Sequence, residues 1–99
     1  TAAQMYTTLT TYSSACRAAG IKFGVVTLTD FVANRAVKDA YNALVDAGAV
    51  NFDFTVPLHL RPELSDCTNT TYFHSDGVHW LDAAKVIVAS EVNAALATI

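Results

Sequence analysis

Two short apolar runs constrain the fold of this chain more than any other feature. They are IKFGVVTL (residues 21–28) and NFDFTVPL (residues 51–58), rich in β-branched and aromatic side chains. Apolar runs of this length are typical of strands that are buried on both faces of a parallel sheet. We therefore predict strands at 21–28 and 51–58, the second ending at Pro57, which has no N–H to donate to a neighbouring strand.

Three helices are predicted around these strands. The first ends at Gly20, and its apolar residues recur at steps of three and four: Met5, Leu9, Tyr12, Cys16 and Ala19. A second helix is expected to be capped by Asn34 and to end at Gly48, with a shared face of Val37, Ala40, Tyr41 and Leu44. Arg35 and Asp39 are spaced for a surface ion pair on it. A third helix is expected from about Asp82 to Ala97, with its apolar side formed by Ala84, Val88, Val92, Ala95 and Leu96.

The order helix, strand, helix, strand, loop, helix predicts an α/β layered fold with a parallel sheet. Two parallel strands leave unpaired edges and bare apolar faces when they stand alone. At 53% apolar and 15% charged residues, the composition is also more apolar than a small isolated domain needs. We therefore expect residues 1–99 to be the second part of a larger sheet domain, with an edge free for a partner.

Composition and short motifs exclude some functions and indicate a compartment. The net charge is −3 and the six basic residues are scattered, so no nucleic-acid partner is expected. No apolar run approaches the roughly 18 residues of a membrane span. Cys16 is interpreted as a buried thiol, and Cys67 as able to pair with Cys16 or with a cysteine elsewhere. Asn69-Thr70-Thr71 matches the glycosylation pattern, and together these features favour a secreted or extracellular protein.

The segment Asp76-Gly77-Val78-His79 carries the chemistry of the chain. A carboxylate three residues before an imidazole, across a turn that glycine eases, can accept the Nδ1 proton of His79 and leave Nε2 free as a base. The pair follows the last strand, at the sheet edge where α/β folds bind ligands. A solvated turn or a helix cap is the alternative. A metal site that includes His74 is not expected, because no second ligand cluster exists.

This segment, with the Asp82-Ala83-Ala84 helix start after it, resembles the last conserved block of the SGNH (GDSL-type) hydrolases, which are esterases and lipases. The resemblance implies one half of a flavodoxin-like, three-layer α/β/α fold, with residues 1–99 as the C-terminal part of a single SGNH domain. It implies a Ser-His-Asp triad in which His79 is the general base and acid, Asp76 orients it, and no cofactor takes part. The substrate would be a small ester or an acylated carbohydrate.

The nucleophile block of that family, Gly-Asp-Ser, and its oxyanion donors do not occur in this sequence. We therefore expect a companion chain or segment to supply the serine, and this chain alone to be inactive. Trp80, Asp30 and Phe31 are candidates to line the substrate cleft; packing is an equal alternative for Trp80, and a plain turn for Asp30 and Phe31. Packing is favoured for Phe73, and His59 and His74 are interpreted as loop residues. The alternative function is a non-catalytic α/β interaction module that binds a partner at its sheet edge.

Overall fold

Two parallel strands lie at the centre of the structure, a computed structural model that describes residues 1–99. Strand β1 (Gly24–Val26) pairs with strand β2 (Phe54–Val56), with Val25 opposite Thr55. The predicted parallel pairing is confirmed, although the strands are shorter than the apolar runs. The pairing ends where Pro57 follows β2. At the other end, the Asp53 side chain accepts the Phe23 N–H at 2.8 Å in place of a backbone carbonyl.

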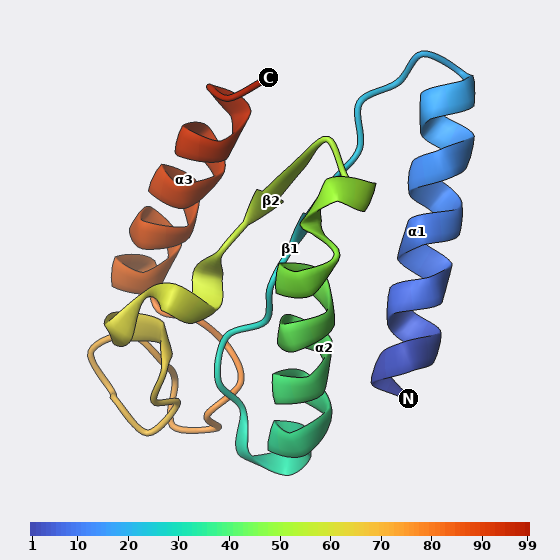
Figure 1. The fold of residues 1–99 in the computed structure, drawn as a ribbon. Helices are drawn as coiled ribbons and strands as arrows, with labels where there is room; N and C mark the ends of the chain where they lie inside the picture. The colour runs from blue at the N-terminus through green and yellow to red at the C-terminus, as the bar shows by residue number, and fades with distance from the viewer.

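Three α-helices flank these strands: α1 (Ala2–Ala18), α2 (Arg35–Ala47) and α3 (Asp82–Leu96). Figure 1 shows α1 and α2 side by side, and α3 on the far side of β2. Short 3-10 turns fill the connections at residues 32–34, 49–51, 58–60 and 62–64. The architecture is thus mixed α/β, with three helices and a small parallel sheet. None of the helices combines the length and apolar character needed to cross a membrane.

The core is divided between the two sides of the sheet. One cluster joins α1, α2 and β1 through Ala2, Val25, Tyr41, Val45 and Phe52. The other joins β2, the 3-10 turns and α3 through Val56, Leu58, Leu64, Ala84 and Ala95. Gly24 belongs to this arrangement because the Phe54 ring lies over it, and a Cβ added at Gly24 would come within 2.2 Å of that ring.

The helix ends agree with the sequence patterns better than the helix faces do. In α1, Ala2 and Ser13 are buried, whereas Met5 and Tyr12 of the predicted face are 41% and 59% exposed. The reason is a hydrogen bond that a hydropathy pattern cannot predict. The Ser13 hydroxyl donates to Asn51 O at 2.6 Å, so the face of α1 that carries Ser13 points toward the interior. The predicted face is therefore wrong for these two residues.

Helix α2 shows three similar corrections. Asn34 precedes the helix as predicted, but its side chain makes no capping hydrogen bond, because a 3-10 turn already leads into the first α-turn. Tyr41 is buried, as predicted, whereas Val37 and Ala40 are exposed. The Arg35–Asp39 pair does not form, because Asp39 contacts Lys38 at 2.9 Å and Arg35 turns toward a buried carboxylate before the helix.

Candidate functional site

Asp76 and His79 meet in the loop that leads from the 3-10 turns into α3. Asp76 Oδ2 lies 2.5 Å from His79 Nδ1, and Asp76 Oδ1 accepts the backbone N–H groups of Val78 (2.9 Å) and His79 (3.1 Å). The hydrogen bond from His79, followed by the two backbone donors, holds the pKa of Asp76 well below its usual range. Asp76 is therefore a carboxylate at neutral pH and can only accept, so the Nδ1 of His79 carries the proton.

The loop around this pair closes on itself. His74 N–H donates to His79 O at 2.9 Å, Gly77 N–H donates to His74 O at 2.9 Å, and Phe73 and Trp80 form an antiparallel bridge. Gly77 has φ +67°, a left-handed conformation that other residues rarely adopt, which explains why a glycine stands between the acid and the imidazole. The chain thereby presents the dyad on a short, closed turn.

The imidazole faces solvent. The His79 side chain is 75% exposed, and its Nε2 has no hydrogen-bond partner in the chain. The pair borders an open hollow of about 710 Å³ lined by His74, Ser75, Asp76, Val78, His79, Trp80 and Lys85. A neutral imidazole with Nδ1–H held and Nε2 free can take a proton from a group that enters this hollow.

The three residues considered for substrate binding lie in different places. Trp80 borders the hollow, half-buried, and its indole N–H donates to Thr29 Oγ1 at 3.1 Å. Asp30 and Phe31 do not line the hollow, so the structure does not bring them to the dyad. Phe73 is only 1% exposed, which agrees with its predicted packing role.

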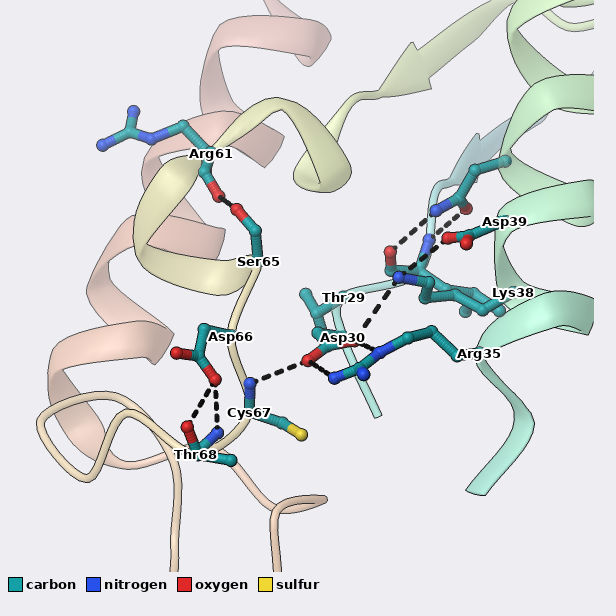
Figure 2. A network of polar contacts seen from close by, with 12 residues as sticks. Thr29, Asp30, Arg35, Lys38, Asp39, Arg61, Ser65, Asp66, Cys67 and Thr68 are labelled. Atoms are coloured by element: carbon teal, nitrogen blue, oxygen red, sulfur yellow. Dashed lines mark hydrogen bonds and ion pairs between the residues drawn. The ribbon is translucent and has the colours of Figure 1, made fainter. Parts of the chain in front are cut away.

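Asp30 instead forms a buried clamp at the end of β1 (Figure 2). Its carboxylate accepts two hydrogen bonds from Arg35, at 2.8 and 2.7 Å, and one from the Cys67 N–H at 2.9 Å. Lys38 Nζ lies 3.5 Å away. Hydrogen bonding to Arg35 outweighs burial and holds the pKa of Asp30 far below its usual range. All of these bonds are made within the chain, and they join the end of β1 to α2 and to the loop at Cys67.

The two cysteines and Asn69 were also singled out in the sequence. Cys16 and Cys67 are both free thiols, so the pairing considered for them does not occur in this structure. Burial raises the pKa of the Cys67 thiol, which is therefore a poor nucleophile. Asn69 is exposed, with its side chain accepting the Thr71 N–H at 3.0 Å.

A second acid–imidazole pair is present that was not predicted from the sequence. His59 Nε2 lies 2.7 Å from Asp46 Oδ2, and His59 Nδ1 lies 2.7 Å from the Thr27 hydroxyl. The series Asp46, His59, Thr27 has the atom types of a triad, but Thr27 is 1% exposed and its Oγ1 also accepts the His59 backbone N–H at 3.1 Å. No substrate reaches that hydroxyl, so this group joins α2, β1 and the turn at 58–60. Thirteen residues separate Asp46 from His59, and no sequence motif signals their contact.

Comparison with family models, with curated proteins and with solved structures finds no match to this chain. The functional interpretation therefore depends on the geometry of the dyad and on the motif that it forms in the sequence.

Proposed function

We propose that this chain supplies the His–Asp part of a serine ester hydrolase of the SGNH type. The observation that carries the proposal is the contact between Asp76 Oδ2 and His79 Nδ1 beside an exposed Nε2 that has no partner. In ester hydrolysis, His79 Nε2 would take the proton of a serine hydroxyl as that oxygen attacks the ester carbonyl. It would then return the proton to the leaving alcohol, while Asp76 stabilises the imidazolium formed between the two steps.

The nucleophile is proposed to lie on a companion chain or segment. Ser13 donates to Asn51 O and Ser65 to backbone carbonyls, and no serine of this chain is hydrogen-bonded to His79. A serine from outside would reach the hollow beside Nε2, where Trp80 offers an apolar wall for the acyl or sugar part of a small ester. The oxyanion donors would come from the same companion.

The sheet supports a companion independently of the chemistry. Strand β1 pairs only with β2, so its other edge has no neighbouring strand. Beside β1 is a mainly apolar hollow of about 510 Å³ lined by Thr1, Gln4, Met5, Thr8, Leu9, Val26, Leu28 and Tyr41. The same observation favours the second candidate function, a non-catalytic α/β module that binds a partner through this edge.

The test uses the protein as purified, with any polypeptide that copurifies. A fluorophosphonate probe should label a serine on the companion and none within residues 1–99. His79→Ala should abolish most ester hydrolysis, and Asp76→Asn should lower kcat by a factor of about 10²–10⁴ because it removes the acceptor that fixes the imidazole.

The matched controls are His59→Ala and Asp46→Asn, which break the other acid–imidazole pair and should leave hydrolysis near the wild-type level. Labelling of a serine in this chain, or near-normal turnover in His79→Ala, would contradict the proposal. A companion that binds but carries no reactive serine would favour the interaction module.

A further inference from the structure

Two consecutive residues that follow β1 are bonded to the chain on either side of the dyad loop, at Cys67 before it and at Trp80 after it. The Thr29 hydroxyl accepts the indole N–H of Trp80, the residue next to His79, at 3.1 Å. Asp30 accepts the backbone N–H of Cys67 at 2.9 Å (Figure 2). The sequence distance is large in both cases, 51 and 37 residues, so each bond fixes one segment to the end of a central strand.

Cys67 continues the second attachment to the dyad itself. A Cβ added at Gly77 would lie 3.5 Å from Cys67 Sγ and 3.6 Å from Cys67 O, so Cys67 is a near neighbour of the turn between Asp76 and His79. Cys67, Asp76 and Gly77 also border one shared hollow on this side of the loop. The turn therefore lies beside a residue whose backbone is bonded to Asp30.

The dyad needs such support because its own contact is weak in water. Asp76 and His79 have side chains that are 47% and 75% exposed, and exposed ion pairs contribute little to holding a geometry. The loop from residue 74 to residue 79 belongs to no helix or strand. By contrast, Asp30 is 3% exposed and has a bidentate hydrogen bond to Arg35, so it is a rigid reference point.

We propose that Thr29 and Asp30 are positioning residues for the Asp76–His79 dyad. Thr29 fixes the loop on the side of His79 through Trp80, and Asp30 supports the turn on the side of Asp76 through Cys67. Neither residue lines the hollow beside His79, so each would act on the dyad through the residue to which it is bonded. The catalytic consequence rests on the proposed hydrolase function, whereas the effect on the imidazole does not.

The test reads the tautomer of His79 from the ¹⁵N shifts of its two ring nitrogens at a pH where the ring is neutral. In the wild type the proton should reside on Nδ1, because Asp76 accepts it. Thr29→Val removes the hydroxyl at nearly constant shape, and Thr29→Ser keeps it. Asp30→Asn removes the charge from the second anchor. Thr11→Val and Asp39→Asn are controls on exposed helix positions.

We expect the share of the Nδ1–H tautomer to fall clearly in Thr29→Val and in Asp30→Asn, and to stay at the wild-type value in Thr29→Ser and both controls. If Asp30→Asn does not fold, Arg35→Gln, which loosens Asp30 from its half-exposed partner, should shift the tautomer in the same direction. In an active assembly, Thr29→Val should lower kcat about tenfold or more with little change in KM, because misplacing a catalytic group by about 1 Å costs up to 10²-fold.

A folded Thr29→Val protein with the wild-type tautomer would overturn the role of Thr29, and so would Thr29→Ser behaving like Thr29→Val. A wild-type tautomer in folded Asp30→Asn, or in Arg35→Gln where the first does not fold, would overturn the role of Asp30. If the hydrolase proposal fails, the tautomer still shifts and no turnover is found. If the positioning proposal fails, turnover is found and the tautomer does not move.

Discussion

Removing the Asp30 carboxylate should destabilise this chain more than any other change to its charged residues. Asp30 is 3% exposed and accepts three close hydrogen bonds, two from Arg35 and one from the Cys67 N–H. In Asp30→Ala the buried Cys67 N–H loses its only acceptor, which costs about 1–3 kcal/mol. The Arg35 side chain is 51% exposed and regains water, so losing the ion pair itself adds about 1 kcal/mol or less.

Together these terms predict a loss of about 1–4 kcal/mol in the free energy of unfolding. For a domain with a total stability of about 5–15 kcal/mol this is a large fraction. The matched control is Asp39→Ala. Asp39 also contacts Lys38, but its carboxylate is 67% exposed. That change should cost about 0.5 kcal/mol or less, because it leaves no buried group without a partner.

The pH dependence of this difference has a definite sign. The folded-state pKa of Asp30 lies below its unfolded value of about 3.9, mainly because of the hydrogen bonds from Arg35. The stabilisation is therefore fully present above about pH 5, and is lost as the pH falls below about 4 toward the folded-state pKa. The difference between wild type and Asp30→Ala should be constant near neutral pH and shrink at acid pH.

Urea denaturation followed by fluorescence measures these differences, since Trp80 is the single tryptophan of the chain. The assay is run on the protein as purified, at pH 7 and at pH 3. A loss under about 1 kcal/mol at pH 7, or a difference that does not change between the two pH values, would refute the account of the clamp.

Two further predictions follow from contacts outside the dyad. His59→Ala should lower the free energy of unfolding by about 1–2 kcal/mol, measured by denaturation, because it removes a bonded partner of the buried Thr27 hydroxyl; an unchanged stability would contradict this. Gly24→Ala should cost about 1–3 kcal/mol, because its Cβ would come within 2.2 Å of the Phe54 ring. Phe54→Leu should then destabilise the Gly24→Ala protein less than the wild type, and an equal or larger loss would contradict the predicted clash.

Element order and type could be predicted from this sequence because they depend on local patterns. The run 51–58 ends its strand at Pro57, and the third helix was expected from Asp82 and is observed at Asp82–Leu96. Helix faces could not be predicted as well, because a buried polar group reverses the expected pattern. Ser13 turns inward since Asn51 O accepts its hydroxyl, and Met5 is left largely in solvent. That acceptor lies 38 residues away, beyond the reach of any local pattern.

The candidate site shows the same division between local and distant contacts. The contact between Asp76 and His79 was predicted, because three residues and a glycine fix its geometry within one turn. Asp30 was a candidate to line the cleft, since it follows β1 at the edge where ligands bind, and a plain turn was the equal alternative. It is instead neutralised by Arg35, five residues later, after a 3-10 turn that the sequence did not indicate. Its second partner, Cys67, depends on the folded position of a distant loop.

The two acid–imidazole pairs of this chain have similar hydrogen-bond lengths but opposite surroundings. His59 has both ring nitrogens bonded within the chain, one to Asp46 and one to the buried Thr27 hydroxyl, so neither nitrogen is free to accept a proton from a substrate. His79 has one nitrogen bonded and the other free beside an open hollow. An imidazole acts as a base through a nitrogen that is free to accept, so exposure and not the carboxylate contact separates the two. His79 Nε2 has no hydrogen-bond partner, and the outer edge of β1 has no neighbouring strand. In the proposed assembly, a single companion would place a serine beside Nε2 and would also cover the edge of β1.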